Sequence, residues 1–268
     1  MNFFCISNYN NDLDWLSEYS NPHLIYDKTW AGGVSDNDNS ELLLPSNLKE
    51  KYPNYNITNG DPNGYNISDY MKFIIDHYEN LPDIVVFLKG NIIGRHISKE
   101  YFDRVINNKC FTCLEDWKEH TLDPTCWYAM FSCEGGWMEK NDSWYLNHPK
   151  HPTKYFKNYN DFLDFSFIDA LHPRYIRFPP GGNFIVPKEY ILKYDKVFYE
   201  NLRTFARHTR VSGEGQMIER ALYTIWMGNY QVSERMKELI IEYVKPFTPE
   251  EYVIEYNNNQ TNTKMIYD

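Results

Sequence analysis

Four cysteines fall within one short segment near the middle of the chain and could together bind a metal ion. They are Cys110, Cys113, Cys126 and Cys133, of which the first two form a Cys-x-x-Cys pair. Four thiolates suit the tetrahedral coordination of structural zinc, which would stabilise a segment without regular helices or strands. Zinc ribbons usually supply two such pairs, however, and the second pair here has a different spacing. Reduced and mostly buried thiols are the alternative, since disulfides are not expected in a cytosolic chain.

Polar residues also follow segments whose pattern predicts strands. Asn8, Tyr9 and Asn10 come directly after the apolar run 3–7. Because ligands of an open parallel sheet bind beyond the carboxyl ends of its strands, the two amides and the ring could hold a nucleobase or a ribose. The alternative is that the three residues only form an Asx turn.

A dense turn signal, Asn-Gly-Asp-Pro-Asn-Gly at 59–64, leads into a predicted helix. Gly64 and Asn66 stand at this entry, where the backbone N–H groups of a helix start can bind a pyrophosphate. Ser68 is expected to cap the helix, whose apolar residues then recur at helical spacing.

The elements that would position these residues alternate between strand and helix along the chain. The run from Ile84 to Leu88 is apolar without polar alternation, which is typical of a strand covered on both faces. A strand, a helix and a buried strand in succession imply a right-handed parallel crossover. We therefore predict an α/β fold with a mainly parallel central sheet flanked by helices. The expected strands are 3–7, 23–26, 55–58, 84–88 and 184–186, the expected helices begin at 12, 68, 98, 188, 215 and 236, and 31–40 is expected to be loop.

We expect one domain over residues 1–245, with an irregular excursion rich in cysteine and tryptophan at 110–160 and a polar tail at 246–268. The formal net charge of -10 argues against a broad attraction to nucleic acids or anionic lipids. No segment approaches the ~20 apolar residues that span a bilayer, and the first residues do not have the pattern of a signal peptide. A cytoplasmic location is therefore expected.

Three segments resemble a family of uncharacterised glycosyltransferase-like domains of fungi and large DNA viruses, related in fold to the GT-A glycosyltransferases. They are SNYNNDLDWL at 7–16 with IYDK at 25–28, YMKFIIDHYENLPDIVVFLKG at 70–90, and GGNFIVPKEYILKYDKVFYENL from 181 with IERALYTIW at 218–226. They cover about a third of the chain and leave out its cysteine-rich middle. The resemblance implies a GT-A-like, Rossmann-like fold, a nucleotide-sugar donor, a glycan or protein-linked acceptor, and the host cytoplasm if the chain is viral.

The resemblance also raises the question of a divalent metal. GT-A enzymes typically carry an Asp-x-Asp motif at the strand end that corresponds to Lys89, Gly90 and Asn91, and this sequence has no carboxylate there. Lys89 or His96 could offset the diphosphate charge instead, so metal dependence stays open. The alternative for Lys89 is a solvated strand end. An Asp-Asn-Asp run at 36–38 is a further metal candidate, although it follows no buried strand.

An inverting sugar transfer needs a carboxylate that takes a proton from the acceptor hydroxyl. Glu219, in the segment that resembles the family, and Glu214 are the candidate catalytic bases. The alternative for Glu219 is an ion pair with Arg220 or Arg203. Three further residues are candidates for the acceptor site, because two glycines open space for a sugar and an amide can bind its hydroxyls; they are Gly181, Gly182 and Asn183.

Glycosyl transfer is therefore the leading hypothesis. A non-catalytic carbohydrate- or protein-binding module on the same fold is the alternative, supported by the missing Asp-x-Asp motif. A third hypothesis is a zinc-stabilised interaction protein whose working part is the segment 110–151.

Overall fold

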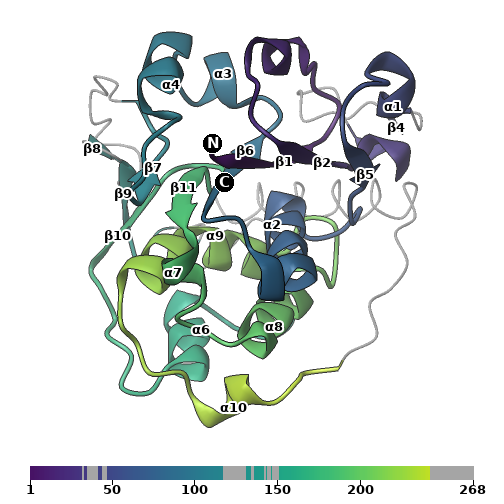
Figure 1. The fold of residues 1–268 in the computed structure, drawn as a ribbon. Coiled ribbons are helices and arrows are strands. Elements are labelled where there is room, and N and C mark those ends of the chain that lie inside the picture. The colour runs from purple at the N-terminus through teal and green to yellow at the C-terminus, as the bar shows by residue number, and fades with distance from the viewer. Residues whose placement is uncertain are drawn as a thin grey trace, which may run out of the picture.

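A six-stranded sheet organises the protein. The computed structural model describes residues 1–31, 33–34, 42–43, 47–116, 131–133, 136–141, 143, 146 and 151–241. Within these residues the strands of the sheet follow the order β5-β2-β1-β6-β11-β7 (Figure 1). Their bounds are β1 Phe3–Asn8, β2 His23–Asp27, β5 Ile57–Asn59, β6 Ile84–Lys89, β7 Thr112–Cys113 and β11 Phe184–Pro187.

Four of the six strands are parallel, as the sequence predicted. β1 pairs in parallel with both β2 and β6, and β2 pairs in parallel with β5. β11 runs antiparallel to β6 and to β7, so the sheet is mixed. The chain enters β11 at the end of the sheet where β6 finishes, because Phe184 pairs with Phe87 and Pro187 pairs with Ile84.

The strand order reverses between β1 and β6. From β1 the chain moves outward to β2 and β5, and then returns to form β6 on the other side of β1. Such a topological switch point is where open α/β sheets form a ligand crevice, just beyond the carboxyl ends of the two strands. A ligand is therefore expected to bind beside the residues that follow β1 and β6.

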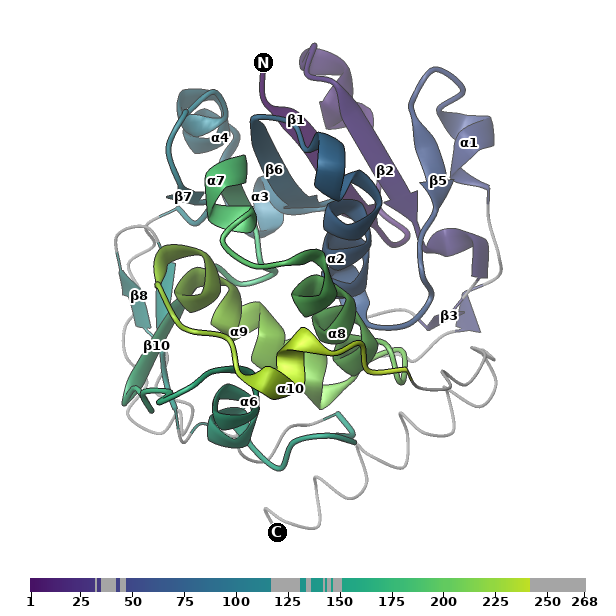
Figure 2. The ribbon, with the colours of Figure 1, turned by 60° about the horizontal axis from the view of Figure 1, so that its bottom comes forward.

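Helices cover both faces of the sheet and bury Ile84 to Leu88 of β6, as the uninterrupted apolar run predicted. One face carries α2 (Tyr65–His77), α8 (Lys196–Ala206) and α9 (Gly213–Met227), and the other carries α4 (Lys99–Val105) (Figures 1 and 2). Alternate β6 side chains pack on opposite faces: Val85 and Phe87 belong to the α2–α9 core, and Ile84, Val86 and Leu88 to the core under α4.

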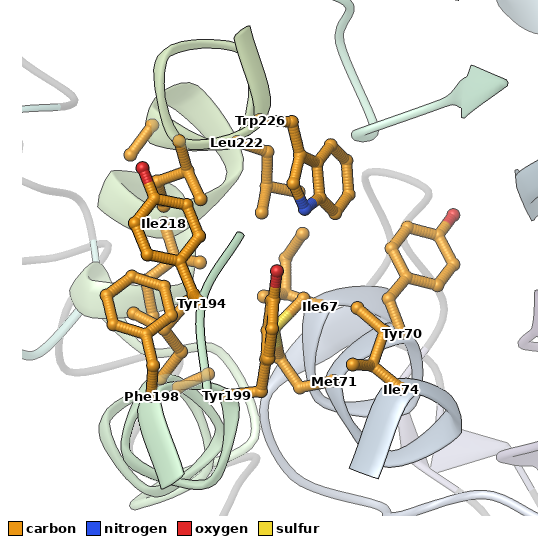
Figure 3. Close-up of a cluster of buried hydrophobic side chains, with 14 of the residues drawn as sticks. Ile67, Tyr70, Met71, Ile74, Tyr194, Phe198, Tyr199, Ile218, Leu222 and Trp226 are labelled. Atoms are coloured by element: carbon orange, nitrogen blue, oxygen red, sulfur yellow. The ribbon is translucent and has the colours of Figure 1, made fainter. Parts of the chain in front are cut away.

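Aromatic side chains dominate the core between α2, α8 and α9. Trp226 of α9 stacks on Phe87 of β6 with ring centroids 5.4 Å apart. Figure 3 shows Trp226 and Leu222 facing Ile67 and Tyr70 of α2, with Tyr199 of α8 completing the cluster. This packing fixes α9 against the sheet and so fixes the position of every side chain that α9 presents to the crevice.

Several boundaries differ from the sequence predictions. α2 begins at Tyr65 with Gly64 as its N-cap, because Gly64 adopts a left-handed φ of 79°, and Ser68 therefore lies inside the helix. The segment 31–40, expected to be loop, contains β3 (Gly33–Val34), which pairs antiparallel with β4 (Leu42–Leu43). α10 covers Glu234–Lys237 and is the last helix among the described residues, so it begins two residues before the predicted helix 236–244, of which 242–244 lie outside the described residues.

The excursion at 110–160 is more regular than its composition suggested. β9 (Gly136–Lys140) pairs antiparallel with β8 (Phe131–Cys133) and β10 (Tyr175–Phe178), forming a separate three-stranded sheet that packs on α9. No helix within the described part of the chain is long and apolar enough to cross a membrane. The remaining helical elements are η1 Asp14–Glu18, η2 Thr29–Ala31, α1 Leu48–Lys51, η3 Tyr78–Asn80, α3 Ile92–Arg95, α6 Tyr159–Ser166 and α7 Lys188–Ile191.

Candidate functional site

Asn8 and Gly90 meet at the switch point. The Gly90 amide donates to the Ser7 carbonyl over 2.9 Å, and a β-carbon on Gly90 would lie only 1.9 Å from Asn8 Oδ1. Trp15 Nε1 donates to the Gly90 carbonyl over 2.9 Å and holds the turn from the other face. Asn8 and Asn91 each bury an Oδ1 atom that has no hydrogen-bond partner among the described residues. Buried acceptors are normally satisfied, so these two amides point to a ligand or ordered water in the crevice.

The glycine loop that precedes β11 packs against the end of β6 at the switch point. A β-carbon on Gly181 would lie 2.7 Å from Lys89 Cδ and 3.2 Å from His96 Cε1. Asn183 Oδ1 accepts the Lys89 amide over 2.9 Å, and Asn183 Nδ2 donates to the Pro180 carbonyl over 2.9 Å. The predicted residues of β6 and of the acceptor loop are therefore direct neighbours, although about ninety positions of sequence separate them.

Two side chains from different helices hold Gly181 in place. Asn66 Nδ2 of α2 donates to the Gly181 carbonyl over 2.7 Å, and Glu219 Oε1 of α9 accepts the Gly181 amide over 2.9 Å. Gly181 and Gly182 have φ angles of 84° and 61°, which glycine adopts without strain. The structure thus brings Asn66, Gly181, Lys89 and Glu219 together at one edge of the sheet.

Glu219 uses one of its two carboxylate oxygens to hold the glycine loop. Its side chain is 13% exposed, and Oε2 has no partner among the described residues. Arg220 lies 3.9 Å from Glu219 Oε1, but its Nε donates to Glu139 Oε2 over a much shorter 2.6 Å. Burial raises the pKa of the nearby Tyr70 hydroxyl well above its ordinary value, and the negative charge of Glu219 adds to that rise, so Tyr70 stays protonated.

Glu214, the second candidate base, is fully engaged in structural contacts. The carboxylate is buried, and its Oε1 accepts the backbone amides of Lys154 and Tyr155 over 2.6 and 2.7 Å and that of Phe156 over 3.4 Å. Its Oε2 pairs with His208 Nε2 at 2.8 Å. These contacts tie the segment before α6 to the start of α9.

At the start of α2, the backbone N–H groups of Gly64 and Tyr65, which were predicted to meet a pyrophosphate, instead bond to the loop after α8. The Gly64 amide donates to the carbonyls of Thr209 and Arg210 at 3.0 Å each, and the Tyr65 amide donates to Arg210 at 3.2 Å. Arg210 also places its guanidinium 4.4 Å from the centre of the Tyr9 ring. Asn10, in the same loop as Tyr9, donates its amide to Thr29 Oγ1 over 3.1 Å. The loop after α8 therefore binds both the α2 start and the residues after β1.

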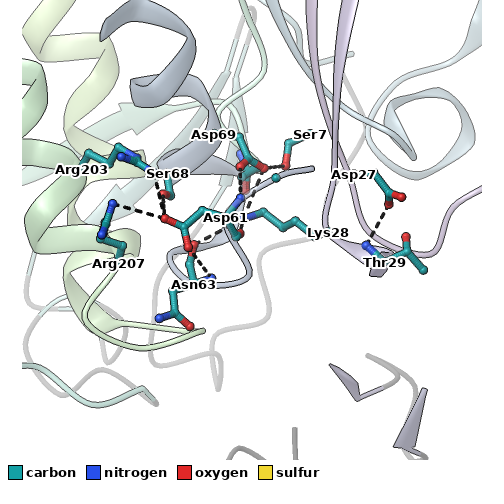
Figure 4. Close-up of polar contacts among 12 residues, drawn as sticks. Ser7, Asp27, Lys28, Thr29, Asp61, Asn63, Ser68, Asp69, Arg203 and Arg207 are labelled. Carbon is teal, nitrogen blue, oxygen red and sulfur yellow. Dashed lines mark hydrogen bonds and ion pairs between the residues drawn. The ribbon is translucent and has the colours of Figure 1, made fainter. Parts of the chain in front are cut away.

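A buried network of charges lies beside the crevice, and sequence reasoning missed it (Figure 4). Lys28 Nζ lies 3.3 Å from Asp69 Oδ2 and also donates to the Asp61 carbonyl. Ser7 Oγ donates to Asp69 Oδ2 over 2.5 Å. Burial raises the pKa of the Asp69 carboxyl, and burial likewise lowers the pKa of the Lys28 ammonium. Lys28 stands in the IYDK segment, which was the available signal, but its partner Asp69 lies about forty residues away.

The residues at the crevice do not match a carboxylate-rich metal site. The end of β6 offers amide and amine groups, as the sequence indicated, and divalent magnesium or manganese prefers carboxylates. Cys110 is exposed and Cys113 is buried, while Cys126, the Cys133 side chain and the run 36–38 lie outside the described residues. Within the described part of the chain no three His, Cys, Asp or Glu side chains gather as metal ligands.

A cavity of about 170 Å³ lies away from the switch point, between α6, β10 and α9. Its lining is mainly apolar and includes Phe167, Ile176 and Tyr223. Tyr223 follows Glu219 by one turn of α9, so the cavity and the crevice share this helix.

A family model described as "Protein of unknown function (DUF3431)" matches residues 7–241. That range contains every crevice residue named above, from Asn8 to Glu219. No curated protein and no solved structure matches the chain. The description of the family names no activity, so the function has to be inferred from the geometry of the crevice.

Proposed function

The chain belongs to the DUF3431 family of proteins of unknown function, and from its crevice we propose that it is a glycosyltransferase of GT-A-like fold. It would move a sugar from a nucleotide-sugar donor to a glycan or a protein-linked acceptor. The observation that carries this proposal is the meeting of Asn8, Lys89, Gly181 and Glu219 at the switch point of the sheet.

The donor nucleotide would lie over the ends of β1 and β2. The unpartnered Asn8 Oδ1 accepts a hydrogen bond from the base or the ribose. Arg210 covers one face of the Tyr9 ring, so the base would stack on the opposite face. Asp27, the buried acid at the end of β2, uses Oδ1 to accept the Thr29 amide over 2.8 Å. Its position suits a ribose hydroxyl, because doubly wound folds place such an acid there.

Lys89 would contact the diphosphate of the donor, and Glu219 would contact the hydroxyl group of the acceptor. A β-carbon on Gly181 would contact both Lys89 and His96, so a diphosphate bound next to this loop would lie beside a cation without needing a carboxylate-bound metal. Glu219 Oε2 takes the proton of the acceptor hydroxyl while that oxygen bonds to the anomeric carbon. The bond from the anomeric carbon to the diphosphate oxygen breaks, and the diphosphate leaves with its electron pair. The Gly181–Glu219 hydrogen bond orients the base.

A non-catalytic binding module is the second candidate function. The absence of a carboxylate in Lys89, Gly90 and Asn91 favours it, because the leaving diphosphate then lacks the usual metal. A carbohydrate-binding module would share the sugar site with the transferase and differ in turnover, whereas a protein-binding module would need no sugar.

A thermal-shift panel of UDP-, GDP- and dTDP-sugars, with and without manganese, tests donor binding. A rise in melting temperature with one donor class supports the site, and no rise with any donor argues against both the transferase and a nucleotide-dependent module. Donor hydrolysis by the wild type, but not by Glu219→Gln, then separates the enzyme from the binding module.

A further inference from the structure

Arg203 of α8 and Arg207, the C-cap residue that directly follows α8, point at the same carboxylate oxygen. They are four residues apart, so Arg207 lies about one helical turn beyond Arg203 along the chain. Arg203 NH2 lies 2.9 Å and Arg207 NH1 lies 3.6 Å from Asp61 Oδ2 (Figure 4). Asp61 is held by its own turn, because its Oδ1 accepts the Asn63 amide over 3.1 Å.

This arrangement leaves a surplus positive charge. Two guanidinium groups share one carboxylate, and the neighbouring Asp69 is already paired with Lys28. Arg203 and Arg207 each bury an Nε atom without a hydrogen-bond partner among the described residues, and the charges of Asp69 and Asp76 also act on Arg203. Their side chains are 21% and 30% exposed, so a ligand can reach the guanidinium ends.

We propose that Arg203 and Arg207 form a binding site for one phosphate group, with Asp61 as their fixed counter-charge. Paired guanidinium groups present several N–H donors in planes that match phosphate oxygens, and such charge-assisted hydrogen bonds are among the strongest in proteins. The aspartate holds both arginines in place before the ligand arrives, which reduces the entropy lost on binding. The site does not depend on glycosyl transfer, because it uses none of the residues assigned to the acceptor or to the base.

The phosphate could belong to a nucleotide, to a sugar phosphate or to free phosphate. Asp61 connects the site to the crevice through two hydrogen bonds, from the Asp61 amide to Asp69 Oδ1 at 3.2 Å and from Ser7 Oγ to Asp69. A ligand that fills the crevice and extends across this network would use both places. A free phosphate or sugar phosphate would use the arginine site alone.

Arginine Nε–Hε signals in nitrogen-15 NMR spectra report this binding directly. The wild type is titrated with inorganic phosphate, glucose 1-phosphate and UDP, and the signals of Arg203 and Arg207 are expected to shift with at least one of them. The ligand that binds most tightly identifies the source of the phosphate. Shifts in neither signal with any of the three ligands would overturn the proposal.

Variants separate a phosphate site from a purely structural ion cluster. Arg207→Gln should weaken phosphate binding roughly tenfold, because a charge-assisted hydrogen bond is lost. Asp61→Asn should instead tighten it, because the competing negative charge is gone. Lys99→Gln, which removes a cation on α4 that pairs with Asp103 at the other face of the sheet, is the matched control and should change nothing. Equal weakening by the control and by Arg207→Gln would contradict the site.

Arg207→Lys serves as a further test if Asp61→Asn does not fold. It should bind phosphate with intermediate affinity, since it keeps the charge without the planar fork. Wild-type affinity in both Arg207→Lys and Arg207→Gln would overturn the proposal.

Discussion

The Asn8 side chain occupies the space that a β-carbon on Gly90 would need. The Asn8 Oδ1 atom would stand 1.9 Å from that carbon, far inside van der Waals contact. Asn8 ends β1 and Gly90 directly follows β6, so this contact lies at the point where the strand order reverses. It defines the floor of the proposed donor site and explains why position 90 is a glycine.

Gly90→Ala should therefore disturb both stability and ligand binding. The added methyl group forces Asn8 or the turn after β6 to move, and overpacking of this kind costs about 1–3 kcal/mol. Urea denaturation measures the loss. The double variant Asn8→Ala with Gly90→Ala should recover most of it, because the clashing side chain is removed. Unchanged stability and binding in Gly90→Ala would show that the two residues are not packed as described.

Glu219→Gln should reduce activity with little effect on stability, whereas Glu214→Gln should mainly reduce stability. Glu219→Gln keeps an oxygen that can accept the Gly181 amide but loses the charged base, so transfer should fall by roughly 10²–10⁴-fold with little loss of stability. Glu214→Gln replaces a buried carboxylate that accepts three backbone amides, and weaker hydrogen bonds should cost about 1.5–3 kcal/mol. Donor turnover and urea denaturation of both variants give the comparison. An active Glu219→Gln would remove Glu219 as the base.

Lys28→Met should destabilise the protein in a pH-dependent way. Breaking a buried ion pair costs about 3–5 kcal/mol when the partner stays charged. In the wild type burial raises the pKa of Asp69, while Lys28 and the Ser7 hydroxyl hold it down. Without Lys28 the folded-state pKa of Asp69 rises further above its unfolded value of about 3.9. A raised carboxyl pKa means that the folded state binds the proton more tightly, so stability is greatest at low pH and falls as pH rises through the folded pKa.

The penalty of Lys28→Met should therefore grow from about pH 4 upward, relative to the wild type at each pH. Urea denaturation across that range measures it. Lys28→Met combined with Asp69→Asn is the control, since it has no carboxyl group to titrate and should lose the pH-dependent part. A penalty that is the same at every pH would mean that Asp69 does not depend on Lys28 for its charge.

Local sequence pattern was enough to predict the core of the sheet. The unbroken apolar run at 84–88 gave β6 and its burial on both faces, and helical spacing gave α9 within two residues of its start. The α2 start was wrong because the N-cap is Gly64 in a left-handed conformation, whereas the prediction relied on a serine side chain. No local sequence pattern indicated that β11 is antiparallel. Its direction depends on the end of the sheet at which the chain enters β11 after the glycine loop.

Candidate site residues were easier to recognise near strand ends than inside charge networks. Asn8, Lys89 and Gly181 were found because each follows a strand or forms a turn, and the structure brings all three to one edge of the sheet. Arg203 was considered only as a partner of Glu219, and its pairing with Asp61 was not predicted, because that contact joins a helix to a turn more than a hundred residues earlier. Composition and spacing carry no information on such a contact.

Titration of the nitrogen-15-labelled protein with UDP-, GDP- and dTDP-sugars in the presence of magnesium tests the central claim most directly, because each backbone amide reports its own surroundings. A donor that binds at the switch point should shift the amides of Ser7 to Asn10, Lys89 to Asn91 and Gly181 to Asn183 more than any others. If no donor shifts these amides, or if the largest shifts fall on other elements, the crevice is not a nucleotide-sugar site.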